Sequence, residues 1–547
     1  MFRAFHRIPA PLLALVAGGI APLGFQPLGW WPCTLAGFAV LFHLLHRAER
    51  SRRAALIGWL FGVGLFSVGN NWIATAFTYQ AAMPAWLGWV AVVLLAFYLA
   101  VYPMLAGVAA WRLAGGSREH TPGAGFGLVA ILGGCWVFAE WLRGWVFTGF
   151  AWNPVGMVTL GGYDAPGLAG IAPWMGTYAL SGLVVILAGL CWLAVRGGVG
   201  RGGMGRGGAE RGRAGPGMAA RAAMVLVPVL LFAVPWPAWH GGEGDLRFTL
   251  VQPDIRQDVL NDSAWFERNF RKTAALTARV DAGDGPRLVL WPESGVPDYL
   301  REGYPDRYYR MTTYAADPRL ARARIADVIG PDSMLLTGAV DLVIGPDERA
   351  SAVRNVVTAI GPDARIRGSY AKAHLVPYGE YLPMRNVLEP IGLSRLVEGA
   401  LDFEEGPGPR TLDLGAYGRA GIQICYEIIF PGAVADRSDR PDYIVNPTND
   451  GWFGAWGPPQ HLAQARMRAI EEGLPVLRPT TTGISAVIDA GGTVRAHIPQ
   501  FRDGRIDALV PPARAPTWFA RAGNGLSLGW ALLFLLAGMV ATRRPRV

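Results

Sequence analysis

GIQICYEIIF, at residues 421–430, is an apolar run that carries a cysteine and then a glutamate. Its short length and its β-branched residues predict a buried strand of an α/β fold, with polar side chains where the strand ends. Cys425 is the only cysteine in the long polar part of the chain, because Cys33, Cys135 and Cys191 fall in apolar segments. Without a neighbour for a disulfide, Cys425 is a candidate nucleophile.

The composition points away from an ordinary soluble protein. Of 547 residues, 52% are hydrophobic and only 17% are charged, and the 21 tryptophans suit anchoring at a membrane interface. The net charge of +9 comes from arginines that crowd a few short connectors. This clustering favours a membrane topology signal over a surface for nucleic acid.

Eight apolar runs approach the length of about 20 residues that a bilayer crossing needs. The first follows basic residues as a signal peptide does, but without a convincing cleavage site, so we expect it to be retained. The runs cover about residues 8–26, 30–46, 55–78, 84–110, 124–146, 166–195, 219–238 and 524–542.

The connectors between these runs alternate in charge. Arginines occupy the N-terminus, the 46–53, 112–120 and 196–213 connectors and the C-terminal tail, whereas the intervening connectors carry almost no charge. By the positive-inside rule both termini are cytoplasmic, and the polar block of residues 241–515 lies on the far side of the membrane. We expect the Gly/Arg-rich stretch 197–215 to be a flexible cytoplasmic linker.

The polar block alternates strand-like and helix-like segments. Strands are expected near residues 247–253, 288–291, 334–339, 356–360, 420–425, 443–446 and 484–488, and helices near 263–280 and 460–473. We therefore expect three parts. These are a membrane domain of about seven transmembrane helices (1–240), an α/β domain (241–515), and a final transmembrane helix with a basic tail (516–547).

Two polar residues beyond Cys425 attract attention. Glu293, in WPESG, sits beside a tryptophan and a proline and could take the thiol proton, although a structural acid is also possible. Lys372 could stabilise an oxyanion with a backbone N–H, and Glu380 could hold it, although a solvated surface lysine is the simpler interpretation. His374 and His461 compete as partners for the thiol in a papain-like pair.

Three motifs occur in a telling order: WPESG with Glu293, YAKAHLVPYGEYLP with Lys372, and GIQICYEIIFP with Cys425. They resemble the Glu-Lys-Cys triad of the nitrilase (carbon–nitrogen hydrolase) superfamily. The segments NPTNDGWFG (446–454), QH (460–461), ARMRA (465–469) and FTGFAWNP (147–154) resemble its membrane branch, the apolipoprotein N-acyltransferases. The resemblance covers essentially the whole chain, and the Arg-rich linker is the part least like the pattern.

The resemblance implies a fold and a set of roles. The fold would be a multi-pass α-helical membrane domain of about eight spans carrying a nitrilase-like αββα sandwich outside the cytoplasm. Glu293 would be the general base, Cys425 the nucleophile, and Lys372 the stabiliser of the tetrahedral intermediate. Supporting or substrate-binding positions would be Glu380, Tyr426, Glu427 and Trp452.

The resemblance also implies a reaction in the bacterial inner membrane. Cys425 would take an acyl chain from a phospholipid as a thioester and pass it to the α-amino group of a diacylglyceryl-modified lipoprotein. No metal or dissociable cofactor would be needed, no nucleic acid would bind, and a monomer would suffice. Keeping acyl chains out of water favours a site that opens toward lipid, with residues 384–401 and 147–165 as candidate mouth segments.

Two other functions stay open. A membrane-tethered amidase or other hydrolase would use the same triad with water as the acceptor. A transporter or scaffold with an extracytoplasmic domain is compatible with eight spans, but charges within the runs are few, with Glu140 near Arg143 as one case.

Overall fold

The computed structural model describes residues 8–79, 84–115, 124–196, 217–239, 241–278, 285–388, 390 and 401–542. The chain divides into two compact units. The first contains residues 1–71, 89–237 and 522–547, and the second contains residues 72–88 and 238–521. The segment 72–88, which the hydropathy pattern assigns to the membrane domain, thus groups with the polar block. The linker 197–215 and the basic tail lie outside the described residues.

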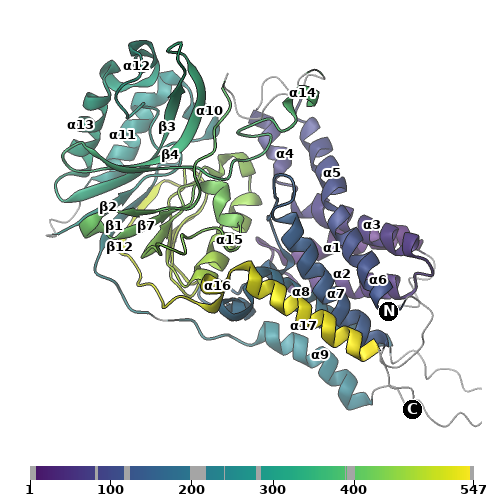
Figure 1. Cartoon of the computed structure of the whole chain (residues 1–547). Coiled ribbons are helices and arrows are strands. Elements are labelled where there is room, and N and C mark those ends of the chain that lie inside the picture. Colours follow the sequence, from purple (N-terminus) through teal and green to yellow (C-terminus); the bar gives the residue numbers. More distant parts are fainter. Residues whose placement is uncertain are drawn as a thin grey trace, which may run out of the picture. The chain divides into compact units, whose positions relative to one another are not determined.

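The first unit consists of helices, and each of the eight apolar runs contains at least one (Figure 1). Proline starts α1 and α2 at positions where its missing N–H costs no helical hydrogen bond. The principal helices are α1 (Ala10–Ile20), α2 (Trp31–His46), α3 (Ser51–Gly69), α5 (Leu87–Leu99), α6 (Val101–Leu113), α7 (Ala124–Arg143), α8 (Ala172–Arg196), α9 (Met218–Ala233) and α17 (Asn524–Thr542).

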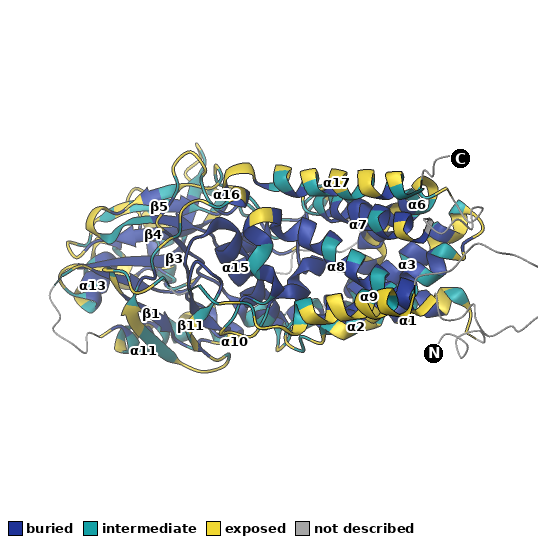
Figure 2. Ribbon diagram, turned by 90° about the horizontal axis from the view of Figure 1, so that it is seen from below, coloured by how far each residue is buried: buried dark blue, intermediate teal, exposed yellow. Residues whose placement is uncertain are grey.

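Small residues let these helices approach closely. A Cβ on Gly64 of α3 would lie 2.2 Å from the carbonyl oxygen of Leu15 in α1. Such contacts are typical of helices that pack in a membrane, where close van der Waals contact replaces the hydrophobic effect. Outward faces are apolar instead: α17 exposes Leu532, Leu536 and Val540 (Figure 2). Exposed apolar faces of this kind suit lipid contact.

The number of membrane spans stays a prediction. Within the described residues, four helical segments are long and apolar enough to cross a bilayer: Leu87–Leu113, Gly125–Arg143, Leu168–Arg196 and Asn524–Thr542. A fifth is possible if Ser51–Gly69 and Ile73–Tyr79 form one broken span. The remaining apolar helices, Ala10–Gly24, Trp31–His46 and Met218–Ala233, are shorter, so the expected eight crossings are not established.

The second unit is built on two six-stranded sheets, in the orders β12-β1-β2-β3-β4-β5 and β11-β10-β9-β8-β7-β6. The first sheet contains β1 (Arg247–Gln252), β2 (Arg287–Leu290), β3 (Ser333–Ile344), β4 (Ala350–Ile360), β5 (Ile366–Ala371) and β12 (Gly504–Leu509). The second contains β6 (Thr411–Asp413), β7 (Arg419–Ile422), β8 (Tyr443–Val445), β9 (Val476–Arg478), β10 (Ser485–Ile488) and β11 (Val494–Ile498).

Each sheet has a parallel centre with antiparallel strands at its edges. Strands β1, β2 and β3 run parallel, as do β7, β8 and β9. Buried parallel strands read as continuous apolar runs, and for this reason LVL at 288–290 and YIV at 443–445 were recognisable from sequence. Two such sheets in one unit, with helices covering them, form the layered α/β architecture expected of residues 241–515.

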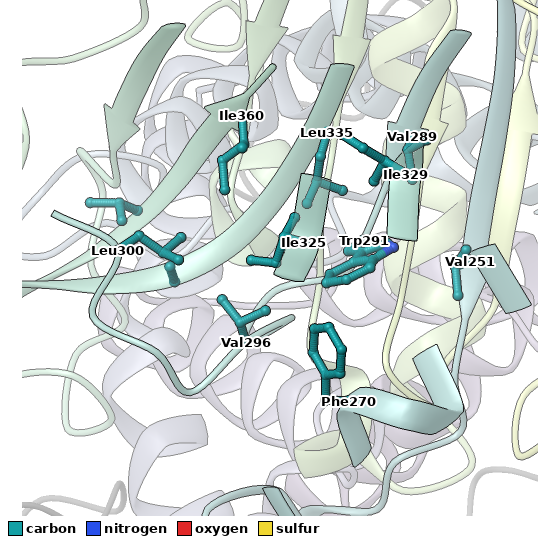
Figure 3. Close-up of a cluster of buried hydrophobic side chains, with 12 residues drawn as sticks. Val251, Phe270, Val289, Trp291, Val296, Leu300, Ile325, Ile329, Leu335 and Ile360 are labelled. Carbon is teal, nitrogen blue, oxygen red and sulfur yellow. The ribbon is translucent and has the colours of Figure 1, made fainter. Parts of the chain in front are cut away.

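Helices α11 (Phe266–Thr277) and α13 (Pro318–Ile329) cover the first sheet. Their apolar faces meet the strands in one core, in which Phe270 of α11 packs edge-on against Trp291 after β2, with ring centroids 6.0 Å apart (Figure 3). Ile325 and Ile329 of α13 fill the same layer. On the second sheet, α15 (Gly457–Glu472) contacts β9 and β10 and ends at Gly473 in the left-handed conformation.

Several elements differ from the sequence expectation. The strand expected over 420–425 ends at Ile422, and Cys425 begins the short 3₁₀ helix η12 (Cys425–Ile429). Strands β5, β6, β9, β11 and β12 and helix α13 were not anticipated. Among these, β11 alternates exposed and half-buried residues, and no residue of β12 is fully buried, so both strands lack the continuous apolar run on which the expectation relied.

Candidate active site

The three residues of the proposed triad follow strands. Glu293 lies three residues after β2, Lys372 directly follows β5, and Cys425 lies three residues after β7. Strands β2 and β5 point the same way, because β3 is parallel to β2 and antiparallel to β4, which is antiparallel to β5. Their carboxyl ends therefore share one edge of the first sheet, and polar side chains converge there.

Lys372 is buried among carboxylates. Its Nζ donates to Glu380 Oε1 at 2.9 Å and lies 3.7 Å from Glu293 Oε1. Burial alone would lower the pKa of Lys372, but the carboxylates of Glu380 and Glu293 outweigh it, so the pKa is raised. Lys372 is thus a fixed cation 1% exposed, which excludes the interpretation as a solvated surface lysine.

Asn355, on β4, joins the two carboxylates. Its side-chain Nδ2 donates to Glu293 Oε1 at 2.7 Å and to Glu380 Oε1 at 3.1 Å. Its backbone carbonyl oxygen accepts the backbone N–H of Lys372 at 2.9 Å. The second oxygen of Glu293 accepts the Asn449 N–H at 2.8 Å. Both oxygens of Glu293 are therefore oriented by buried donors, as positioning of a proton-transfer group requires.

Cys425 adopts a strained backbone conformation. Its φ is +51°, in the left-handed region that costs a non-glycine residue about 1–2 kcal/mol. Its N–H donates to Pro447 O at 2.9 Å. Burial raises the pKa of the Cys425 thiol, the Glu293 carboxylate raises it further, and Lys372 opposes them. The net result is a pKa well above the ordinary thiol value, so at rest sulfur keeps its proton and needs a base.

Glu427 links the lysine loop to the nucleophile turn. Its Oε1 accepts from Tyr370 Oη at 2.8 Å and from the N–H groups of Ala373 and His374 at 2.7 and 3.1 Å. Its Oε2 accepts the Ile424 N–H at 2.7 Å. Burial raises the pKa of Glu427 to about 7 in spite of these four donors. The carboxylate holds the residues beside Lys372 and Cys425 in register.

Tyr426 and Trp452 are the other two expected supporting residues. Tyr426 is buried and packs against His374 and Phe430, with ring centroids 5.9 and 5.3 Å away. Trp452, on η13 (Asp450–Phe453), packs edge-on against Tyr79 at 5.8 Å. Tyr79 belongs to the segment 72–88, so this part of the second unit supplies a partner for the aromatic loop.

His461 does not form the papain-like pair with Cys425. His461 directs Nδ1 to Asp450 Oδ1 at 2.9 Å and Nε2 to the carbonyl oxygen of Cys425 at 3.1 Å, so both ring nitrogens are engaged away from sulfur. The ring of His374 lies tilted against that of Phe430, with 3.8 Å between their centroids. Among the residues that the structure describes, no cluster of three His, Cys, Asp or Glu side chains could hold a metal ion.

Sequence comparisons identify the family of the chain. The carbon-nitrogen hydrolase family matches residues 247–518, and the apolipoprotein N-acyltransferase N-terminal domain matches residues 17–190. The apolipoprotein N-acyltransferase of Rhodopseudomonas palustris is 33% identical over 98% of this chain and 95% of its own. That of Bradyrhizobium diazoefficiens is 35% identical over 97% of this chain and 94% of its own.

This chain belongs to the apolipoprotein N-acyltransferase family. Membership confirms the resemblance drawn from the Glu293, Lys372 and Cys425 motifs, and it places a nitrilase-like fold in the second unit. An amidase from Nesterenkonia sp. overlaps 50% of this chain and 92% of its own, at 16% identity and a TM-score of 0.32. The family matches, and not this overlap, carry the assignment.

Several residues of this family member's site escaped the sequence reasoning. Asn355 was an unremarked polar residue in the middle of β4, where the buried half of the strand begins. Asn449 and Asp450 were in the quoted NPTNDGWFG motif but without roles. Arg478, at the end of β9, has a neutral, apolar local sequence and could be found only from its buried contacts.

Proposed function

We propose that this protein transfers an acyl chain from a phospholipid to the α-amino group of a lipoprotein's N-terminal diacylglyceryl-cysteine, through a thioester on Cys425. The carrying observation is the buried group of Glu293, Lys372 and Glu380, coupled electrostatically to the thiol. It supplies a base, a fixed cation and a counter-charge for that cation, and acyl transfer through a thiolate needs all three.

In the first half-reaction Glu293 takes the thiol proton as sulfur attacks the ester carbonyl carbon. The carbonyl oxygen becomes an oxyanion beside the Lys372 ammonium, which is held by Glu380 at 2.9 Å. Collapse of the tetrahedral intermediate breaks the ester C–O bond. Glu293 returns the proton to the leaving alkoxide, which departs as a lysophospholipid and leaves the Cys425 thioester.

In the second half-reaction the lipoprotein amine attacks the thioester carbonyl. Glu293 removes a proton from the attacking nitrogen, Lys372 again faces the oxyanion, and the C–S bond breaks. The proton passes back to sulfur, restoring the thiol whose raised pKa favours its protonated form. The products are an amide on the lipoprotein and the free enzyme, so the cycle has no net change in redox state and uses no cofactor.

The decisive experiment follows the Cys425 peptide by mass spectrometry. Purified protein incubated with phospholipid should gain one acyl chain on Cys425, removable with neutral hydroxylamine, and a lipopeptide with a free amine should discharge it. Cys425→Ala should gain none. If the wild-type adduct never forms, the proposed function is wrong.

The same experiment separates transfer from hydrolysis. A tethered amidase or hydrolase would lose the acyl group to water at a rate that the lipopeptide does not change. A transporter or scaffold would gain no adduct and would keep its activity in Cys425→Ala.

We further propose that the unit of residues 72–88 and 238–521 works on the outer side of the bacterial inner membrane, with both termini cytoplasmic and the enzyme acting as a monomer. The arginine-rich connectors support this topology. Two exposed apolar side chains, Met384 and Val387, lie at the start of the expected mouth segment 384–401, although residues 389 and 391–400 are outside the described part. On the other candidate mouth segment, Phe147 is 86% exposed.

A further inference from the structure

We propose that Arg478, acting through Asp450 and His461, is a positioning residue that sets the backbone of Cys425 and the orientation of Glu293 for acyl transfer. The inference rests on the proposed function and deepens it. None of these three residues needs to touch the substrate. Together they form a buried polar network that reaches the carbonyl oxygen of Cys425.

Arg478 donates hydrogen bonds to alternate residues of the segment 446–450, which follows β8. Its Nη1 donates to Asn446 Oδ1 and to Thr448 Oγ1, the latter at 3.0 Å, and its Nη2 donates to Asp450 Oδ2 at 2.8 Å. The Arg478 and Asp450 side chains are both fully buried. A planar guanidinium can serve three acceptors at fixed angles, whereas an ammonium is a point charge. The residue type is therefore matched to this task.

The segment 446–450 and His461 make hydrogen bonds to both backbone groups of Cys425, its carbonyl oxygen and its N–H. Asn446 Nδ2 donates to Gln423 O at 2.6 Å and approaches Cys425 O at 3.3 Å, and His461 Nε2 lies 3.1 Å from the same oxygen. On the other side of Cys425, its N–H donates to Pro447 O at 2.9 Å. A left-handed residue persists only where its surroundings over-determine it. This network supplies that restraint at the nucleophile.

The same segment orients the base. The backbone N–H of Asn449, between two residues gripped by Arg478, donates to Glu293 Oε2 at 2.8 Å. The side chain of Asn449 is fixed in turn, donating to Gln257 Oε1 at 2.8 Å and accepting from Thr481 Oγ1 at 2.8 Å. Movement of residues 446–450 would displace the nucleophile and its base together, and small misplacements of reacting groups are costly.

Arg478→Lys tests the inference against a matched control. Arg466, on α15, is another buried arginine of the second unit, and its Nε donates to Gly492 O at 2.8 Å. Arg466→Lys therefore controls for the loss of a buried guanidinium. For wild type and both variants, two quantities are measured: the single-turnover rate of Cys425 acylation by phospholipid, and the melting temperature. The alkylation of the Cys425 peptide by iodoacetamide is followed across pH.

The expected result separates positioning from folding. Acylation in Arg478→Lys should slow about 10–100-fold with the half-saturating phospholipid concentration unchanged, and the alkylation profile of Cys425 should shift. Arg466→Lys should lose much less acylation rate than Arg478→Lys, because the Arg466 Nε donates to Gly492 O. Equal acylation rates and alkylation profiles in wild type and Arg478→Lys would overturn the inference, as would an equal loss in Arg466→Lys.

If Arg478→Lys does not melt cooperatively, a pair of His461 variants tests the inference instead. His461→Gln keeps an amide donor near the position of Nε2, whereas His461→Leu removes it. We expect the leucine variant to lose acylation rate and the glutamine variant to recover part of it, and equal rates in the two would contradict the network. Wild-type protein that never acylates would instead refute the proposed function, so the two failures are distinct.

Discussion

The Lys372 ammonium lies 2.9 Å from Glu380 and 3.7 Å from Glu293, and all three side chains are buried. Glu380 is therefore the nearer counter-ion, which leaves Glu293 to be oriented by Asn355 and the Asn449 N–H. In the proposed mechanism, Glu380 neutralises the Lys372 ammonium and Glu293 takes the thiol proton. The division of labour between two glutamates follows from these distances.

Glu380→Gln should expose that division. Without its nearer counter-ion, Lys372 should shift toward Glu293, and acylation of Cys425 should slow roughly 100-fold. Single-turnover acylation and a melting curve are the measurements. Glu404→Gln is the control, because Glu404 pairs with Arg354 where both side chains are about half-exposed. An acylation rate for Glu380→Gln matching that of Glu404→Gln would contradict the assignment.

Lys372→Met should abolish oxyanion stabilisation. Removing a donor of this kind typically costs about 10²–10³ in rate, and we expect acylation to fall by that order. Lys272 is the other lysine of the chain and provides the control, since it is partly exposed and donates to Asp254 O. Lys272→Met should acylate within about 2-fold of wild type. A comparable loss in both variants would point to a general charge effect.

Glu293→Gln should separate the acidity of the thiol from its catalytic use. Glu293 raises the pKa of Cys425, so its neutralisation should lower that pKa and speed alkylation by iodoacetamide at mildly alkaline pH. Acylation should nevertheless fall about 10²–10⁴-fold, because the base is gone. The Cys425 peptide is quantified separately from those of the other three cysteines. Slower alkylation in Glu293→Gln would refute the electrostatic coupling.

Because of Glu427, we expect kcat to decrease on the acid side of its pH profile. Its pKa is raised to about 7, so it is protonated below that pH and ionised above it. Only the ionised form can accept from all four of its donors, so kcat should rise with pH through about 7. Glu427→Gln should lose this limb and about 10–100-fold in kcat, whereas Tyr370→Phe, which removes one donor, should lose only a few-fold. A limb that persists in Glu427→Gln would belong to another group.

Labels at Val387 and Phe147 test the proposed contact with lipid. Each side chain is apolar and exposed, so a fluorophore there should be quenched by lipids carrying a nitroxide on the acyl chain. A label at Arg310 of α12 (Asp306–Thr312), exposed and far from both segments in sequence, should not be quenched. Absence of quenching at Val387 and Phe147 would remove the support for a mouth facing the bilayer.

Much of the local structure could be predicted because short-range patterns of apolar residues in the sequence indicate it. The parallel strands β2 and β8 are continuous apolar runs, and α15 is a helix-period segment between a proline-rich start and a glycine. Each apolar run likewise became at least one helix. The edge strand β12 was missed, because none of its residues is fully buried and polar residues interrupt its apolar run.

The residues of the site divide in the same way. The sequence by itself determined the order of the Glu293, Lys372 and Cys425 motifs and the strands beside Glu293 and Cys425, since motifs and apolar strands are local, whereas β5 before Lys372 was not foreseen. Only the tertiary structure decided that Asn355 joins two glutamates and that Arg478 grips the loop behind the thiol. Those contacts link positions 25 to 62 residues apart, and burial in a fold, not neighbourhood in the chain, is what forces such groups to pair.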